Sequence, residues 1–219
     1  LRFDLTVPLA KYVAAYYNEL TFPYRRYQAG KVFRGKKKKK GRYREFYQCD
    51  IDIIGDGKLS IINDAEIPSI IYTIFKKLNF GPFIIKTNNR KILNGLFDEL
   101  NIADKMKDIL IVIDKLEKIG MDAVKEELAK LEVSQENIEK IESFIKITGT
   151  TDEKLAKLQA LDFESEIFKK GLEELTEVIK YVRLFKVEED SFMIDLTIAR
   201  GLDYYTGTVY ETNLVGYES

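Results

Sequence analysis

The chain has 219 residues, of which 45% are hydrophobic and 32% charged, and its formal net charge is −1. These values are typical of a globular protein with a sizeable core in one or two domains. They argue against a broad basic coat for nucleic acid, and no apolar run approaches the roughly 20 residues of a membrane span. The absence of histidine excludes imidazole bases and imidazole metal ligands, so any chemistry must use carboxylates, Arg, Lys, Tyr and the backbone.

The single cysteine, Cys49, cannot form an internal disulfide. This favours a reducing compartment, so we expect a cytoplasmic protein that has no contact with a membrane. The sequence starts at Leu1 without an initiator methionine and stops at Ser219 just after a strand-like run. We therefore expect a fragment of a longer protein.

The first residues are expected to be extended, and an amphipathic helix is predicted to begin near Pro8 and to end at about Tyr17. Asp4 and Thr6 permit two interpretations. A carboxylate beside a hydroxyl suits an α-ammonium group of a ligand. The same residues ahead of a helix are also typical capping residues.

Residues 27–33 and 43–54 are predicted to form two long antiparallel strands, because Tyr, Phe and Ile favour strands. The loop between them holds five consecutive lysines, Lys36 to Lys40. Alternation defines a polar face of the second strand, made of Arg44, Phe46, Gln48, Asp50 and Asp52. The opposite face is largely apolar after Glu45 and is expected to pack on a core. A solvated hairpin, with Asp52 as a surface carboxylate and a solvated lysine loop, remains an alternative.

Helices are predicted at 61–78 and 89–100, on either side of a short strand at 83–87; Asp64 is interpreted as an ordinary helix charge. From 101 to 189, Lys and Glu alternate with Leu and Ile at helical spacing, and Thr150 and Glu153 have capping-box spacing. We expect this all-helical stretch to be inserted between the two parts of a core domain, 1–100 and 190–219. Its mixed charge leaves a plain packing subdomain as an alternative.

Strand alternation returns at 192–198, and 208–212 is expected to be the return strand. The connector between them reads ARGLDYYTG. Its glycine beside Arg200 gives backbone freedom, and Tyr204 and Tyr205 offer flat faces and hydroxyls for an aromatic imidazole. A glycine-containing turn with a core tyrosine pair fits the same residues.

Three blocks in this order resemble the histidyl-tRNA synthetases, which are class II aminoacyl-tRNA synthetases. FRG…GRYREFYQCDIDIIG resembles their motif 2 in its eukaryote-like form, LTIARGLDYYTGTVYE resembles the histidyl signature, and LRFDLTVP resembles the segment ahead of motif 2. The resemblance implies an α+β fold, with a class II antiparallel sheet flanked by helices and an all-helical insertion domain. It also implies a ligase that activates histidine with ATP to histidyl-adenylate and transfers the histidyl group to tRNA(His).

The resemblance also implies roles for individual residues. Arg34 and Arg200 are the expected catalytic residues, which hold the α-phosphate of ATP and stabilise its charge. ATP, with Mg²⁺ on its triphosphate, is expected to contact Arg34, Arg42 and Arg44, and no metal ligand is expected in the chain itself. The implied histidine-binding residues are Asp4, Leu5, Thr6, Arg34, Gln48, Asp52, Arg200, Tyr204 and Tyr205.

The sequence departs from the family pattern at Gly35 and Lys36, where relatives carry an acidic residue that helps to recognise adenine. Motif 1, which builds the homodimer interface, and motif 3, which supplies another ATP-binding arginine, are expected outside these 219 residues. The fragment alone is therefore expected to be inactive.

Two functions from other classes remain as alternatives. One is a non-catalytic, synthetase-like regulatory or histidine-sensing domain. Relatives of that kind tend to lose pocket residues, which are all present here. The other is an RNA-binding module that uses the lysine loop and the helical insertion, and it predicts salt-dependent RNA binding without dependence on an amino acid.

Overall fold

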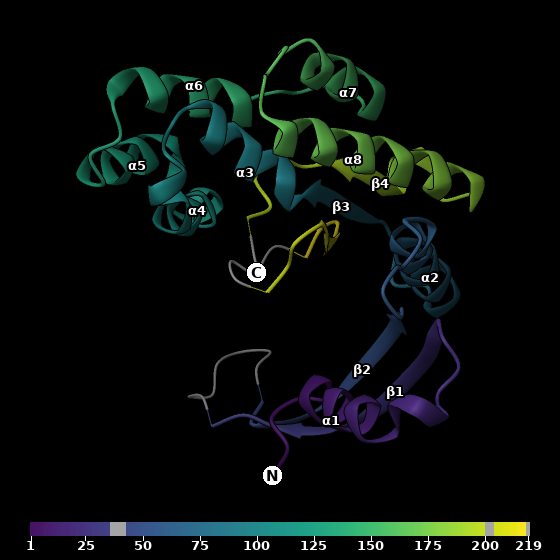
Figure 1. The fold of residues 1–219 in the computed structure, drawn as a ribbon. Coiled ribbons are helices and arrows are strands. Elements are labelled where there is room, and N and C mark those ends of the chain that lie inside the picture. Colours follow the sequence, from purple (N-terminus) through teal and green to yellow (C-terminus); the bar gives the residue numbers. More distant parts are fainter. Residues whose placement is uncertain (36–42, 200–203, 218–219) are drawn as a thin grey trace. The chain divides into compact units, whose positions relative to one another are not determined.

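The structure is a computed structural model that describes residues 1–35, 43–199 and 204–217. The chain divides into two compact units, residues 1–63 and residues 64–219, and we describe each by itself. Figure 1 identifies their helices and strands. Arg42, Arg200 and the lysine run, for which the sequence predicted roles, lie outside the described residues.

The first unit is built on the predicted hairpin, which is confirmed. Its elements are α1 (Thr6–Tyr16), a 3₁₀ helix (Tyr17–Glu19), β1 (Tyr24–Phe33) and β2 (Glu45–Ile54). β1 and β2 pair antiparallel in a register that places Gly30 opposite Gln48. The chain at Arg2 runs along β1, where its carbonyl accepts the backbone N–H of Phe33 at 2.9 Å and its Nε donates to the carbonyl of Lys31 at 2.7 Å.

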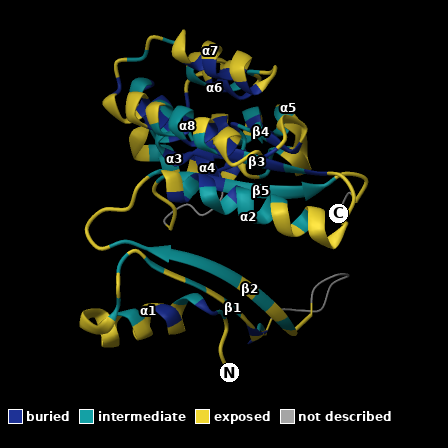
Figure 2. Cartoon of the chain, turned by 90° about the vertical axis from the view of Figure 1, so that its right-hand side faces the viewer, coloured by how far each residue is buried: buried dark blue, intermediate teal, exposed yellow. Residues whose placement is uncertain are grey.

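The prediction that the apolar face of this hairpin packs on a core was wrong. The N-terminal segment covers the polar face instead, since a Cβ built on Gly30 would lie 3.6 Å from Leu5 Cδ2. On the opposite face, Tyr27 is 86% exposed, Tyr47 is 68% exposed and Cys49 is also exposed. Figure 2 shows the exposed and intermediate residues along the two strands. The polar face tolerates cover because its charged and amide groups bond to one another.

The sheet of the second unit has three strands in the order β4–β3–β5. β3 (Phe83–Asn89) pairs in parallel with β4 (Phe192–Ile194) and antiparallel with β5 (Thr208–Leu214). The α+β class is therefore confirmed, although this sheet is mixed rather than wholly antiparallel. A parallel pair needs a long crossover, and the helices between β3 and β4 supply it.

The strand predicted at 192–198 ends earlier, at Ile194. The Asp195 carboxylate accepts two hydrogen bonds from Thr197, one from its backbone N–H at 3.0 Å and one from the Thr197 hydroxyl at 2.6 Å. The backbone N–H of Ile198 in turn donates to the Asp195 carbonyl at 3.3 Å. This side-chain-to-backbone turn competes with the strand and ends it.

Helices make up most of the second unit. They are α2 (Ile62–Leu78, which begins at the unit boundary), α3 (Arg90–Glu99), α4 (Met106–Ile113), α5 (Leu116–Lys130, interrupted at Gly120), α6 (Gln135–Ile145), α7 (Thr151–Gln159) and α8 (Glu166–Leu184), with 3₁₀ turns at Ala103–Lys105 and Glu189–Ser191. The regular elements between 101 and 189 are helical, as predicted. The boundaries of an inserted domain stay a prediction. None of the helices in the described part of the chain is long and apolar enough to cross a bilayer.

The core of the second unit lies where α3 and α8 cross beside β3 (Figure 1). Two glycines allow the helices to meet at backbone distance. A Cβ on Gly95 would lie 2.4 Å from the nitrogen of Phe168, and one on Gly171 would lie 2.8 Å from the nitrogen of Ile92. Apolar side chains fill the surrounding space, and complete burial of each stabilises the fold by about 1.5–3 kcal/mol. They include Ile85, Ile92, Leu93, Leu96, Phe97, Leu175, Val178 and Ile179.

Candidate active site

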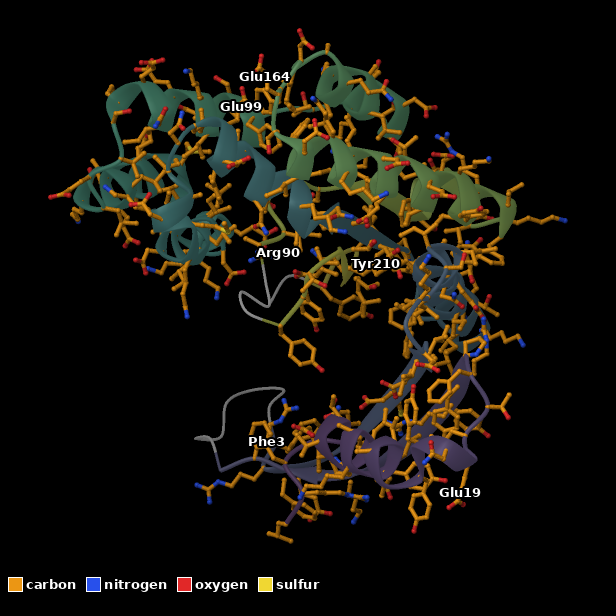
Figure 3. The ribbon with its side chains drawn as sticks, viewed as in Figure 1. Phe3, Glu19, Arg90, Glu99, Glu164 and Tyr210 are labelled. Carbon is orange, nitrogen blue, oxygen red and sulfur yellow. The ribbon has the colours of Figure 1, made fainter. Side chains whose placement is uncertain are left out.

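The polar face of the β1–β2 hairpin carries a chain of hydrogen bonds that starts at Arg34. Arg34 Nη2 donates to Gln48 Oε1 at 3.2 Å, and Gln48 Nε2 donates to both oxygens of Asp50 at 2.9 and 3.0 Å. The guanidinium also lies over the rings of Phe3 and Phe46, at 4.9 and 5.0 Å from their centroids. Phe3 is labelled in Figure 3. These contacts fix the plane of the guanidinium.

One nitrogen of the Arg34 guanidinium makes no hydrogen bond to the part of the chain that the structure describes. Its Nε is buried and has no hydrogen-bond partner within the described residues. Its backbone N–H donates to the carbonyl of Arg44 at 2.8 Å, so the start of the loop is also held. A buried N–H without a partner is costly, and a phosphate or carboxylate oxygen would satisfy it. The fork of a fixed guanidinium therefore fits an anionic group at this position.

Asp52 lies further along the same face and forms an ion pair with Arg26, Nη2 to Oδ2 at 2.8 Å. The two side chains are 25% and 11% exposed, so Asp52 is not the solvent-exposed carboxylate of the alternative interpretation. Burial raises the pKa of the Asp52 carboxyl, and the negative charge of the neighbouring Asp50 raises this pKa further. The positive charge of Arg26 acts in the opposite direction and lowers it. Asp52 is thus a part-buried acceptor two residues from Asp50.

The N-terminal candidates lie at the start of α1. Asp4 Oδ1 accepts the backbone N–H of Val7, in the first turn of the helix, at 3.0 Å. Leu5 is fully buried, and Thr6 is the first residue of the helix. The N-cap position itself is held by Leu5, so Asp4 supports the first turn from one residue before it, and its role toward an ammonium group stays a prediction.

Tyr204 and Tyr205 belong to the second unit, and the interpretation of them as a core pair was wrong. They are 69% and 49% exposed. Their rings meet edge to face, with centroids 5.2 Å apart and an interplanar angle of 87°. Both rings are therefore accessible to a ligand.

Sequence reasoning missed Asn88 and Arg90, whose side chains hold the chain where it enters the connector that carries these tyrosines. Asn88 Nδ2 donates to the carbonyls of Leu196 and Ile198. Arg90 Nη1 donates to the carbonyl of Ala199. The signal was present in the sequence, since the polar run TNNR interrupts an otherwise apolar strand just before a helix. Figure 3 labels Arg90 at the start of α3.

Asp64 is a second residue whose role sequence reasoning missed, because it was interpreted as an ordinary helix charge. Its Oδ2 accepts the hydroxyl of Thr208 at 2.7 Å, and its carbonyl accepts the hydroxyl of Tyr210 at 2.8 Å. Burial raises the pKa of Asp64 and raises that of Tyr210 well above its usual value. Asp64 therefore ties α2 to β5. Tyr210 is labelled in Figure 3.

The hairpin with its fixed arginine and the helix-flanked sheet with its tyrosine connector define a class II aminoacyl-tRNA synthetase-type fold. The family model described as histidyl-tRNA synthetase matches residues 1–219. The chain belongs to the histidyl-tRNA synthetase family.

Relatives named histidine–tRNA ligase match along the chain. That of Clostridium tetani is 58% identical over 217 residues, covering 99% of this chain and 49% of that protein. That of Nostoc punctiforme is 52% identical over 223 residues, covering 100% of this chain and 47% of that protein. The chain thus spans about half the length of these relatives. The eukaryote-like form suggested by motif 2 stays a prediction.

Solved structures also match the chain along nearly its whole length. The crystal structure of histidyl-tRNA synthetase from Nostoc sp. PCC 7120 matches with a TM-score of 0.94 at 50% identity, over 99% of this chain and 50% of that one. A structure from Bacillus halodurans, described as an ATP phosphoribosyltransferase regulatory subunit/histidyl-tRNA synthetase, matches with a TM-score of 0.84 over 100% of this chain and 55% of that one. Its identity is 21%, so this likeness shows the fold alone.

Proposed function

We propose that this chain is the part of a histidine–tRNA ligase that binds histidine and ATP and forms histidyl-adenylate. The observation that carries the proposal is Arg34, whose guanidinium is fixed by Gln48 and two rings while its buried Nε has no partner within the described residues. Family membership supplies the substrates. Transfer to tRNA(His), homodimer formation and a cytoplasmic location are proposed for the longer protein.

The proposed reaction is an in-line attack of the histidine carboxylate on the α-phosphorus of ATP, which releases pyrophosphate. The carboxylate is ionised at neutral pH and needs no general base, so the lack of histidine in the chain is no obstacle. Arg34 and Arg200 would hold the α-phosphate and offset the charge that develops on it. Arg42 and Arg44 would contact the triphosphate. Mg²⁺ bound to ATP would offset further phosphate charge.

The resemblance to the family suggests a role toward histidine for each of the proposed binding residues. Asp4 and Thr6 accept the α-ammonium group, and Leu5 lies between them in sequence. Gln48 meets the amino-acid backbone, and Asp52 accepts the imidazole N–H. Tyr204 and Tyr205 give the ring its aromatic contacts. An amino acid whose side chain has no N–H or O–H donor could not form a hydrogen bond to Asp52. Such an amino acid would bind more weakly than histidine, which gives selectivity.

Calorimetric titration with histidine tests the pocket, with phenylalanine and glutamine as controls. We expect selective binding of histidine, which is lost in Asp52→Asn and Tyr205→Phe. Titrating both this 219-residue chain and the longer protein shows whether segments outside the chain complete the site. Histidine that binds no better than glutamine to the folded longer protein would contradict the pocket.

Histidine-dependent exchange of pyrophosphate into ATP tests the reaction in the longer protein. We expect Arg200→Ala to abolish exchange while histidine binding is weakened but still measurable, because this arginine acts mainly on the phosphate. Equal loss of binding and exchange would contradict that division of roles. Histidine binding without any exchange in the wild type would favour the regulatory, histidine-sensing alternative, whose fold a structure described as a regulatory subunit shares.

A further inference from the structure

Four consecutive polar residues, Thr87 to Arg90, are buried where β3 ends and α3 begins. Asn88 is fully buried and Arg90 is 2% exposed. Groups of this kind remain inside a protein only when they have hydrogen-bond partners, since burial without partners costs several kcal/mol per group. Their partners therefore indicate what the run holds in place.

On the incoming side, these partners are backbone carbonyls just before the tyrosine connector. Asn88 Nδ2 donates to Leu196 O at 3.3 Å and to Ile198 O at 3.2 Å. Arg90 Nη1 donates to Ala199 O at 2.9 Å. Two side chains thus hold three of the four carbonyls between residues 196 and 199.

On the outgoing side, the same run holds the chain as it leaves the connector. The backbone N–H of Arg90 donates to Gly207 O at 2.9 Å. Thr87 Oγ1 donates to Val209 O at 3.3 Å, and Asn88 lies opposite Val209 in the β3–β5 register. Arg90 therefore contacts both ends of the connector: its side chain binds the carbonyl of Ala199, and its backbone N–H binds the carbonyl of Gly207.

We propose that Asn88 and Arg90 are positioning residues that hold the chain at the two ends of the connector, near Ala199 and at Gly207, and so place Tyr204 and Tyr205 for the amino acid. This rests on the proposed function for the role of the tyrosines. Tyr204 is 69% exposed and Tyr205 is 49% exposed, so neither ring is packed in a core that would hold the connector. Fixed ends restrict the conformations of a short loop, and this preorganises the groups that it carries.

The neighbouring residue Lys91 offers a matched control. Its Nζ pairs with Glu174 Oε1 at 2.5 Å, and Asn89 Nδ2 donates to the other oxygen of Glu174 at 2.9 Å. These contacts tie the start of α3 to α8 and do not involve the connector. Lys91→Ala should therefore disturb the same helix start while it leaves the connector in place.

The kinetic test uses the longer protein, with variants Arg90→Lys and Asn88→Ala. Arg90→Lys keeps the buried charge but loses the guanidinium fork. We expect kcat/KM for histidine in pyrophosphate exchange to fall about 100-fold in each variant, with a raised KM for histidine, because a small misplacement of positioned groups has an effect of this size. The KM for ATP should stay unchanged, and Lys91→Ala should keep both constants.

A merely structural role gives a different result, which would overturn the proposal: less folded protein, lower kcat and unchanged KM values for both substrates. Amide hydrogen exchange of the peptide covering 204–209 gives a second readout that needs no activity. We expect faster exchange in this peptide for Arg90→Lys and Asn88→Ala than for the wild type or Lys91→Ala. Unchanged exchange would also overturn the proposal. A wild type without pyrophosphate exchange would instead count against the proposed function, and hydrogen exchange would still decide the positioning role.

Discussion

At the residue scale, Arg34 combines a charge with a fixed geometry, and Arg34→Lys separates the two. Lysine keeps the charge but loses the fork, the bond to Gln48 and the planar contact with the rings. We expect adenylate formation in the longer protein to fall by about 10²–10³-fold, as for other lost charge-stabilising donors.

Lys31→Met is the control for this substitution, because Lys31 pairs with Glu45 on the other face of the hairpin. It should leave pyrophosphate exchange within about twofold of the wild type, since exposed ion pairs contribute little. Full activity in Arg34→Lys would show that charge alone is sufficient, and would count against a bidentate role.

The environment of Asp195 leads us to expect that the stability of the second unit depends on pH. Burial opposes its ionisation, but hydrogen bonds from the Thr197 hydroxyl and from Lys86 outweigh this and lower the pKa of the carboxyl. A carboxyl with a lower pKa in the folded state stabilises the fold above its unfolded pKa of about 4. This stabilisation is lost as the pH falls through the folded pKa.

Asp195→Asn should therefore lower the free energy of unfolding at pH 7 and have a much smaller effect at strongly acidic pH. Denaturant unfolding at both pH values measures this difference. Asp152→Asn is the control, because Asp152 forms an exposed ion pair with Arg183 at 2.9 Å. An equal loss of stability at both pH values would contradict the linkage of Asp195 to pH.

At the element scale, the crossing of α3 and α8 depends on Gly95 and Gly171. Alanine at position 95 would gain about 1 kcal/mol of helix propensity. Its Cβ would, however, lie 2.4 Å from a backbone nitrogen, which a side-chain rotation cannot relieve. We expect the clash to exceed the gain, so that Gly95→Ala destabilises the second unit by about 1–3 kcal/mol.

Thermal unfolding measures this loss of stability, and Lys170→Ala serves as the control. Lys170 precedes Gly171 on α8 and is exposed, so its replacement should change the midpoint little. A Gly95→Ala variant as stable as the wild type would show that the two helices separate at little cost.

The start of α7 offers a prediction that follows from the sequence alone and that the structure supports. The Thr150 backbone N–H donates to Glu153 Oε2 at 2.8 Å, and the Glu153 N–H donates to Thr150 Oγ1 at 3.3 Å, which is the predicted capping box. Thr150→Ala should lower the free energy of unfolding by about 1 kcal/mol, whereas Thr150→Ser should retain most of it. Equal losses in a denaturant titration would rule out the hydroxyl as the cause.

The fold was predictable where the signal is local, as in this capping box, the hairpin strands and the helices at 3.6-residue spacing. It was not predictable where a distant segment decides. The covered face of the hairpin depends on Leu5, about 25 positions before Gly30 in the sequence. The strand after β3 ends at Ile194 because Asp195 forms a side-chain turn of its own. An alternating sequence pattern predicts neither which face a distant segment covers nor where a side-chain turn ends a strand.

The same division holds for the candidate site. Arg34 and Gln48 were named from motif resemblance, and the structure brings them together. Asn88 and Arg90 were not named, because their roles consist of bonds to backbone carbonyls more than 100 positions away. Such partners cannot be predicted from the spacing of residue types, because every residue has a backbone carbonyl.

At the scale of the whole molecule, the two units differ in how much apolar side chain they bury. Within the described part of residues 1–63, the buried apolar side chains are those of Leu5, Leu9 and Val32, and the rest of the apolar core belongs to residues 64–219. A stretch of this size with so small a core rarely folds alone. We expect residues 64–219 to fold as an isolated polypeptide and residues 1–63 to remain largely unfolded.

Circular dichroism and NMR spectra of the two separate polypeptides measure this directly. Dispersed amide resonances from residues 1–63 alone would contradict the expectation. An unfolded 64–219 polypeptide would show instead that this unit depends on the rest of the chain.

The exposed outer face of the hairpin has a practical consequence. Cys49 is exposed on that face and is the single thiol of the chain. A maleimide dye can therefore be attached at one defined position without mutagenesis. Strand alternation directs the label away from the face that carries Gln48, so the label would lie on the opposite side of the strand from the proposed site. Fluorescence changes on addition of ATP or histidine would then follow ligand binding in real time, independently of catalysis.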